Sequence, residues 1–354
     1  MKKYFVLLLV VIFNGIILSQ QLREKISSKQ YNLNLDKFSG VQLETPTEVY
    51  NGSISYSGAN WIRLKFKEAF LGRNSYLIIT SKKDGSWQKL NSASIEQWNF
   101  TSAYFNGDIL DISLFVGPGD KEIFFSIDTI IVSENNSLSK NVLQPENLCG
   151  SDNRVSSDHK AIGRIVTSNL DPWGTGWILY DGRIVTAGHV VSGLSTLVIE
   201  FNVPNSTYQG SPQHPDPEDQ YSLNLNQGSL NYHNNGEGDD WAVMSVYANS
   251  NTGLLPKEAQ DAFFQVEQNN GAESIRVTGY GSDDGAAYCT QQTDVGNNNG
   301  TSGNIIGYIL DTEGGDSGAP IINDTNGKAI GIHTHGHCSD WGYNVGTGFT
   351  NSGI

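Results

Sequence analysis

The glycine-rich segment 314–320, Gly-Gly-Asp-Ser-Gly-Ala-Pro, contains the residues best suited to covalent chemistry. A serine hydroxyl is a weak nucleophile unless a neighbouring base takes its proton and fixed donors stabilise the oxyanion that forms. Because Gly315 has no Cβ, its backbone N–H can turn toward the same point as the N–H of Ser317. The segment therefore predicts Ser317 as a nucleophile, with the N–H groups of Gly315 and Ser317 as its oxyanion hole. A glycine-rich surface turn is the alternative.

A histidine and an aspartate that could serve this serine lie upstream. The β-branched run Ile184–Thr186 leads through two small residues to His189, which places an imidazole at the end of a rigid strand. Asp240 directly precedes an apolar run that begins at Trp241. We expect His189 to be the general base and Asp240 to fix its tautomer. Asp239 is the alternative acid, and a purely structural histidine is the alternative for His189.

The motifs Gly-Asp-Ser-Gly at 315–318 and Thr-Ala-Gly-His at 186–189 resemble those of the trypsin/chymotrypsin-like serine peptidases. The chain order His189, Asp240, Ser317 is that of the chymotrypsin fold, whereas subtilisin-like and α/β-hydrolase enzymes use other orders. The resemblance implies an all-β fold with two six-stranded barrels and a cleft between them. It also implies peptide hydrolysis through an acyl-enzyme, with no cofactor and no metal.

Two readings of the substrate pocket follow from the same resemblance. Asp311 lies six residues before Ser317, where trypsins carry the aspartate that binds lysine or arginine. The run from Asp311 and Thr312 to Gly315, and Gly-Ile-His ending at His333, instead resemble glutamyl endopeptidases, whose histidine and threonine bind an acidic side chain. Asp311, Thr312 and His333 are thus the expected substrate-binding residues. We favour cleavage after glutamate or aspartate over a basic preference, because an imidazole suits a carboxylate.

Asp316 departs from the glutamyl endopeptidase pattern, which usually has an amide before the serine. In trypsins an aspartate at this place pairs with a freshly cut N-terminus, so Asp316 suggests a zymogen activated by cleavage near Cys149. The sequence 150–155 also resembles the opening of mature glutamyl endopeptidases. A rival cleavage site at Arg164 is rejected, because Ile162–Thr167 is needed as the first strand of the domain.

The composition and net charge limit the classes of partner that the chain is expected to bind. The chain has 354 residues and a net charge of -15, which argues against nucleic acid or an anionic membrane as a partner. With 39 glycines and short alternating apolar runs, the chain is expected to be mostly β. Protein or peptide substrates are the expected partners, and the sequence leaves the oligomeric state open.

The chain is expected to contain an export signal and two domains. Residues 1–20 combine two lysines with an apolar run and a small residue near the predicted cleavage point, which is typical of a signal peptide of a secreted protein. Residues 21–132 predict an antiparallel β-sandwich, from alternating strands at 62–66 and 110–116 and a further strand at 123–132. The segment 101–108 resembles modules that precede trypsin-like domains in secreted bacterial proteins. The sandwich is expected to be an accessory or pro-domain.

Residues 133–148 read as a linker open to proteolysis, and residues 149–354 as the peptidase domain. Within that domain, Pro212–Gln220 is predicted to wall one side of the cleft, and Asn297–Gly300 to form a loop. The three cysteines allow one disulfide, for which Cys289–Cys338 is the first choice among the possible pairings. His333, His335 and His337 alternate on one strand face and invite a zinc interpretation, which we reject because His333 has a pocket role.

Three hypotheses of different classes follow. The first is an exported serine endopeptidase. The second is a catalytically silent binding protein on a peptidase scaffold, and the third is a protein that cleaves only its own linker.

Overall fold

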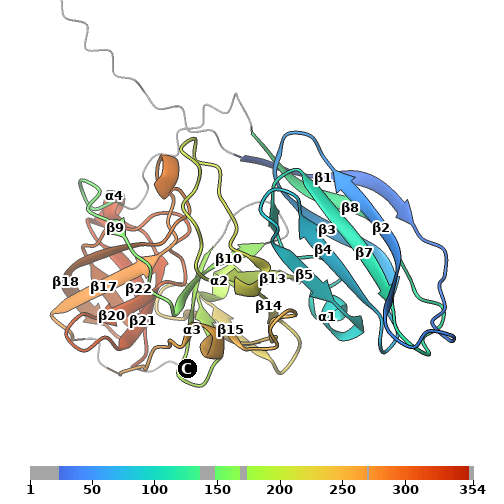
Figure 1. Ribbon diagram of the computed structural model, residues 1–354. Helices are drawn as coiled ribbons and strands as arrows, with labels where there is room; N and C mark the ends of the chain where they lie inside the picture. Colours follow the sequence, from blue (N-terminus) through green and yellow to red (C-terminus); the bar gives the residue numbers. More distant parts are fainter. Residues whose placement is uncertain (1–23, 136–147, 168–173, 269–270, 351–354) are drawn as a thin grey trace, which may run out of the picture.

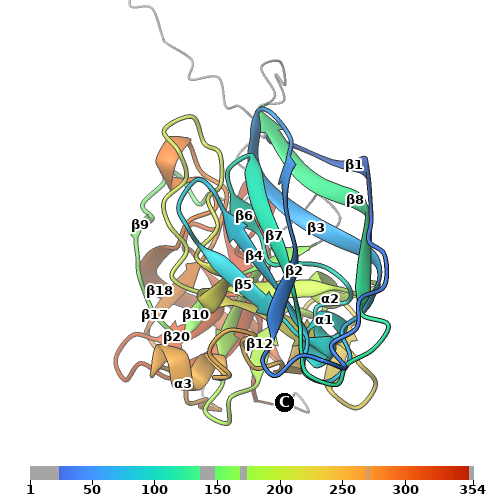
Figure 2. The ribbon, with the colours of Figure 1, turned by 45° about the vertical axis from the view of Figure 1, so that its right-hand side comes forward.

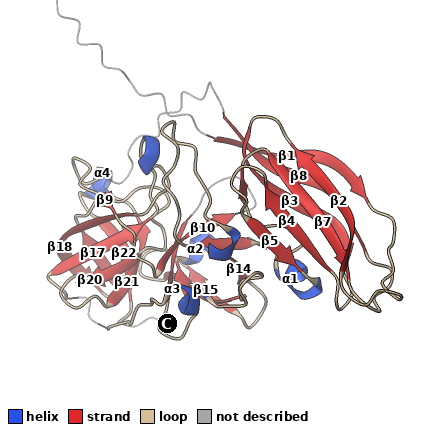
Figure 3. Cartoon of the chain, in the orientation of Figure 1, coloured by secondary structure: helices blue, strands red, loops and turns tan. Residues whose placement is uncertain are grey.

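The computed structural model describes residues 24–135, 148–167, 174–268 and 271–350. The predicted signal peptide lies outside these ranges, as does most of the predicted linker. The described chain is built almost wholly of β-strands, with a few short helices (Figure 3). None of the helices in these ranges is long and apolar enough to cross a membrane.

The N-terminal part is a sandwich of two four-stranded antiparallel sheets, as predicted. Its strands alternate because one face of each sheet is buried: along β7 (Ile109–Val116), every second residue from Leu110 is buried. In order across the sheets, the first contains β1 (Glu24–Asn34), β8 (Phe124–Asn135), β3 (Ala59–Phe70) and β6 (Phe105–Asn106), and the second contains β2 (Thr47–Ser55), β7, β4 (Tyr76–Ser81) and β5 (Trp87–Leu90). One helix, α1 (Ser92–Gln97), is capped by Asn91.

Two closed antiparallel barrels of six strands follow, as in the chymotrypsin-like fold. The first ring contains β10 (Ile162–Thr167), β11 (Gly174–Ile178), β12 (Ile184–Thr186), β13 (Leu197–Glu200), β14 (Gln220–Asn224) and β16 (Asp240–Val246), with β15 (Leu230–Asn234) added beside β16. The second ring contains β17 (Ser274–Gly279), β18 (Gln292–Ser302), β19 (Ile305–Tyr308), β20 (Pro320–Asn323), β21 (Ala329–His335) and β22 (Asn344–Gly348), with β9 (Val155–Ser156) beside β18. The short helices are α2 (Gly188–Val191), α3 (Pro256–Gln260), α4 (Cys338–Trp341), η1 (Pro217–Asp219) and η2 (Gly285–Ala287).

Two local predictions about these elements are wrong. Asn297–Gly300 is not a loop but part of β18, because β18 must pair with both β17 and β19 to close the second ring. The polar composition of this segment reflects its exposure, and the register is irregular between Asn298 and Gly300. In addition, β8 continues to Asn135, three residues into the predicted linker.

The sandwich packs directly on the first barrel (Figures 1 and 2). Tyr104 and Gln220 exchange two hydrogen bonds between backbone and side-chain amide, at 2.9 and 2.8 Å. Asn106 and His214 make a similar pair, at 2.8 and 3.0 Å. The apolar core of the sandwich also includes Val198 of the first barrel.

The segment 212–220 therefore contacts the sandwich rather than forming the cleft wall that its composition suggested. The ring of His214 stacks on Tyr104 and meets Trp61 edge-on, with ring centroids 4.4 and 5.1 Å apart. Glu200 lies at the edge of this ring, with its Oε1 2.6 Å from Nδ1 of His214, and also accepts hydrogen bonds from Arg164. A buried ion-pair network thus lies where the domains meet.

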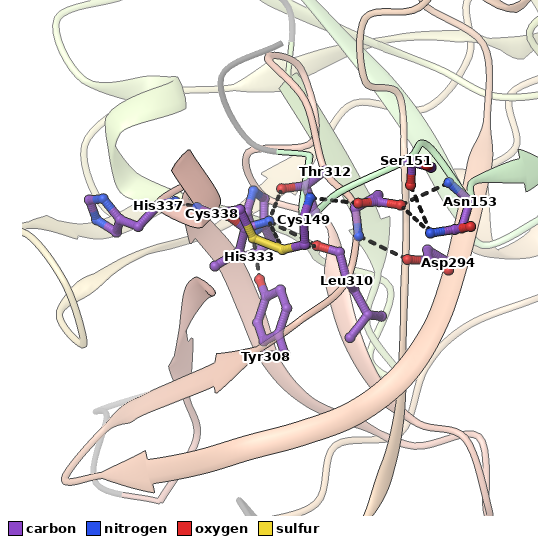
Figure 4. The surroundings of a disulfide bond; sticks show 12 residues. Cys149, Ser151, Asn153, Asp294, Tyr308, Leu310, Thr312, His333, His337 and Cys338 are labelled. Carbon is purple, nitrogen blue, oxygen red and sulfur yellow. Dashed lines mark hydrogen bonds between the residues drawn. A yellow bond between two sulfur atoms is a disulfide. The ribbon is translucent and has the colours of Figure 1, made fainter. Parts of the chain in front are cut away.

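The disulfide joins Cys149 to Cys338, which corrects the predicted Cys289–Cys338 pairing (Figure 4). Cys289 is buried and lies outside this bond. The bond ties the start of the peptidase region to α4, at a sequence separation of 189 residues. Such a pairing depends on the closed second barrel, which brings the two distant segments together.

Candidate active site

His189 lies on α2, directly after β12. The turn into α2 needs a glycine at 188, because a Cβ there would lie 1.8 Å from the carbonyl oxygen of His233. The backbone N–H of His189 donates to Oδ1 of Asp240 at 2.9 Å, and its Nδ1 lies 2.6 Å from Oδ2 of the same carboxylate. Two contacts to one carboxylate fix both the backbone and the ring of His189.

Asp240 begins β16 at the boundary between the barrels, where its N–H donates to Oγ1 of Thr347 on β22. Its side chain is 1% exposed, whereas that of His189 is 36% exposed. The imidazole is therefore open on the side away from the carboxylate. The alternative acid, Asp239, lies near the surface and instead contacts His233 and Asn235. The structure brings Asp240, not Asp239, to His189.

The Ser317 turn is held between the two barrels. The carbonyl of Ser317 accepts from Thr175 N of β11 at 2.8 Å, and Gly318 N donates to the carbonyl of His333 on β21 at 2.9 Å. Gly318 has φ +94°, and a Cβ there would lie 2.1 Å from both Thr175 O and Thr186 Oγ1. Because Thr186 ends the strand that leads to His189, the half-buried Ser317 is placed next to the segment that carries the imidazole.

The peptide group between Gly314 and Gly315 has an orientation suited to an oxyanion hole. The carbonyl of Gly314 accepts from Ser282 N at 2.9 Å. In a trans peptide the N–H points away from the carbonyl, so the N–H of Gly315 faces away from Ser282. Thr175 Oγ1 donates to the carbonyl of Gly315 at 2.9 Å, and Gly315 has φ +110°, which favours glycine.

Asp316 points away from the turn into a buried cradle. Its carboxylate accepts from Glu313 N at 2.9 Å, and a Cβ on Gly279 or Gly281 would lie 2.4 Å from one of its oxygens. Burial raises the pKa of Asp316 to about 6. Arg154 opposes that rise, with its Nη1 3.9 Å from Oδ2 of Asp316. Sequence analysis assigned no role to Arg154. The signal that could have pointed to it is the acidic residue directly before the predicted nucleophile, since a buried carboxylate needs a cation close by.

His333 lies in the second barrel with its side chain almost fully buried. Its Nδ1 is 2.5 Å from the hydroxyl of Tyr308 (Figure 4). Burial, together with the imidazoles of His335 and His189, lowers the pKa of His333 to about 3. The ring is therefore neutral at physiological pH. If the hydroxyl of Tyr308 donates its hydrogen bond to Nδ1, the ring proton lies on Nε2, which is then an N–H donor. Thr312 lies close by, where its Oγ1 accepts from Asn344 Nδ2 at 3.0 Å.

Asp311 makes a different set of contacts. Its carboxylate accepts from Cys149 N at 2.7 Å, from Asn153 N at 2.8 Å and from Asn153 Nδ2 at 3.0 Å. The residue is buried. Asp311 thus anchors the segment that follows the linker, with its oxygens occupied by backbone and amide donors.

The histidine run at 333–337 is not arranged as a metal centre. Cys338 is used by the disulfide, His333 by Tyr308, and His337 by Glu237, whose Oε1 lies 2.8 Å from Nε2. Within the described ranges, no three His, Cys, Asp or Glu side chains are placed to hold a metal ion.

Comparison with known proteins agrees with this geometry. Residues 174–332 match the family model of the trypsin-like peptidase domain. The matched stretch contains His189, Asp240 and Ser317, so the part of the chain that carries the candidate site is similar to trypsin-like peptidases.

The chain is also similar to individual proteins. The chain is 28% identical over 173 residues to a glutamyl endopeptidase of Staphylococcus epidermidis, a match that covers 46% of this chain. It spans only 54% of the length of that relative. Among solved structures, a Glu endopeptidase in complex with MPD has a TM-score of 0.46 at 19% identity and covers 57% of this chain and 93% of its own. The protease Anisep from Arthrobacter nicotinovorans has a TM-score of 0.44 at 17% identity, and the match covers 55% of this chain and 93% of Anisep.

Proposed function

We propose that this protein is a serine endopeptidase in which Ser317, His189 and Asp240 form the catalytic triad. The observation that carries the proposal is the His189–Asp240 pair, with Nδ1 and Oδ2 2.6 Å apart, beside a serine turn bonded to both barrels. A buried carboxylate on Nδ1 holds the proton there and leaves Nε2 as a base on the solvent side.

The reaction follows from these positions. Ser317 Oγ attacks the carbonyl carbon of the scissile bond while His189 Nε2 takes the hydroxyl proton. The N–H groups of Gly315 and Ser317 stabilise the oxyanion. His189 then gives its proton to the leaving amine, and the acyl-enzyme forms. His189 then takes a proton from a water molecule as that water attacks the ester carbonyl, and it returns the proton to Oγ of Ser317 as the ester bond breaks and the acid leaves.

The preferred substrates are peptides with glutamate or aspartate directly before the scissile bond. Asp311 supports this choice, because its carboxylate is occupied by Cys149 and Asn153 and does not offer its charge to lysine or arginine. His333 supports it too, because a neutral ring with N–H at Nε2 donates to a carboxylate without needing to be protonated. Thr312 contributes a hydroxyl beside it. The proposed donor is thus a neutral imidazole and not a protonated one, since the pKa of His333 is lowered to about 3.

A set of matched fluorogenic peptides that differ only in glutamate, aspartate, lysine or arginine before the scissile bond tests activity and preference together. We expect kcat/KM to be highest for glutamate or aspartate. Ser317→Ala should lower kcat by on the order of 10⁴-fold or more. Activity that survives this substitution would overturn the nucleophile assignment, and a higher kcat/KM for lysine or arginine would overturn the acidic preference.

We further propose that the protein is exported and that residues 1–20 are removed. The apolar run after two lysines supports this, as does the Cys149–Cys338 disulfide, since such bonds persist in oxidising compartments. N-terminal sequencing of the protein from culture medium is the test, and a retained Met1 would contradict it.

A further inference from the structure

The carboxylate next to the proposed nucleophile is buried, and a buried charge must be compensated. Asp316 is 3% exposed and lies in a cradle made by two glycines. Its hydrogen bonds come from the backbone N–H groups of Glu313 and Gly281. Arg154 lies at the open side of this cradle: a Cβ on Gly281 would be 2.7 Å from its Nη1.

The side chain of Arg154 is itself 4% exposed and held rigidly. Its Nε and Nη2 donate to Asp152 at 3.0 and 2.7 Å, and its Nη1 donates to the carbonyl of Ser282 at 3.0 Å. Nη1 is also 3.9 Å from Oδ2 of Asp316. Asp152 and Asp283 add negative charge around the guanidinium, so it stays ionised.

Ser282 connects this guanidinium to the oxyanion hole. Its carbonyl accepts from Arg154, while its N–H donates to the carbonyl of Gly314. That second bond fixes the peptide group whose other end is the N–H of Gly315. Arg154 therefore acts on the oxyanion loop by two routes, through Ser282 and through Asp316.

We infer that Arg154 is a positioning residue that orders the oxyanion loop of the uncut chain. Its guanidinium holds the place that our sequence analysis gave to a newly cut N-terminus. The inference builds on the proposed function, because it takes Ser317 as the nucleophile. It departs from the zymogen hypothesis: the backbone N of Cys149 lies 2.7 Å from Oδ1 of Asp311, so an amine created there would face Asp311 and not Asp316.

The test compares four full-length variants with the linker shown to be intact by mass spectrometry: Arg154→Gln, Arg154→Lys, Asp316→Asn and the double variant Arg154→Gln/Asp316→Asn. The measurements are the rate at which a fluorophosphonate probe labels Ser317 and the kcat and KM for a glutamyl peptide. Arg183→Gln is the control, because Arg183 pairs with Asp181 on the surface.

We expect Arg154→Gln to lower the labelling rate and kcat by about 10² to 10³, the loss typical of one oxyanion donor, with little change in KM. Arg154→Lys should recover part of this loss. Asp316→Asn removes the buried charge, so it should stay within about 10-fold of wild type. The double variant should recover most of the Arg154→Gln loss but not all of it, because the contact with the carbonyl of Ser282 is still missing. Arg183→Gln should behave like wild type.

Three results would overturn the inference: an Arg154→Gln chain that labels normally, a double variant no better than Arg154→Gln, or a wild-type chain that labels only after the linker is cut. If Arg154→Gln fails to fold, a double variant that folds and labels supports the inference, and one that also fails to fold refutes it. A wild-type chain that takes no label before or after the cut overturns the proposed function and this inference together.

Discussion

The ring of His214 stacks on the ring of Tyr104 with centroids 4.4 Å apart and an interplanar angle of 13°, and the two rings belong to different domains. Both residues are buried, and Glu200, which contacts Nδ1 of His214, forms an ion pair with Arg164. An interface of this kind resembles the inside of a domain more than a removable contact. We propose that the sandwich is a permanent part of the folded protein and not a discarded pro-region.

Cutting the linker between residues 136 and 147 should leave the sandwich bound to the barrels. The disulfide does not join the two domains, since both of its cysteines lie in the peptidase region, so co-elution would report the noncovalent interface alone. Size-exclusion chromatography after limited proteolysis measures this. Two separate peaks at micromolar concentration would show that the sandwich dissociates.

Tyr104→Ala should lower the free energy of unfolding by about 3 to 5 kcal/mol, as expected when a buried aromatic ring is removed. The substitution also removes the contacts of this ring with His214 and Arg63. Tyr208→Ala is the matched control, because Tyr208 is 88% exposed. Chemical denaturation of both variants is the measurement, and equal losses would show that the interface is not a source of stability.

Glu200→Gln should destabilise the protein at neutral pH and much less in acid. Burial alone raises the pKa of Glu200, but the charges of His214 and Arg164 outweigh burial and hold the pKa below its usual 4.5. The stabilisation is therefore present above the unfolded pKa and is lost as pH falls through the folded pKa. Breaking a buried pair costs about 3 to 5 kcal/mol at pH 7. Denaturation from pH 7 to pH 3 checks this against the exposed Glu68→Gln, and a difference that does not shrink in acid would contradict it.

Asp240→Asn should lower kcat by about 10⁴-fold, because an amide can leave His189 in the wrong tautomer. Asp239→Asn is the control, since Asp239 contacts His233 and not His189. It should stay within a few-fold of wild type. Steady-state kinetics on the glutamyl peptide distinguish the two, and the reverse ranking would make Asp239 the catalytic acid.

His333→Ala should lower the ratio of kcat/KM for glutamyl over lysyl peptides by about 10-fold or more, because the Nε2 donor is lost. Asp311→Asn should leave that ratio within a few-fold, since the side chain of Asp311 contacts Cys149 and Asn153 and does not present its charge to the pocket. If Asp311→Asn instead selectively removes activity toward lysyl peptides, the pocket binds basic side chains through Asp311.

The contact between His189 and Asp240 could be predicted from the sequence, because each residue lies in a short motif whose neighbours have a local reason to be there. The catalytic roles of these residues and of Ser317 remain predictions. Gly318 and Gly188 are examples: one has a positive φ, and both face backbone or side-chain atoms that leave no space for a Cβ. The order of the motifs then predicted two barrels. Both predictions rest on information that is local to each motif or on the order of the motifs along the chain.

The contacts that sequence reasoning missed join distant segments that have no motif of their own. Cys149–Cys338, Arg154–Asp316 and Tyr104–His214 each depend on how a closed barrel or a docked sheet brings separate loops together. The segment 212–220 looked like a solvent-facing loop because proline and aspartate predict turns. The sandwich that covers it could not be inferred from its composition.

Gly279 and Gly281 pack against the carboxylate of Asp316, so the residue types at positions 279, 281 and 316 depend on one another. A side chain at residue 279 or 281 would occupy the space of the carboxylate, since a Cβ would lie 2.4 Å from an oxygen. An alanine at either place would therefore be tolerated only together with a smaller residue at 316. In distant homologues, these positions should co-vary, and a glycine pair accompanied by a basic residue at 154 would mark chains whose active site is assembled without processing.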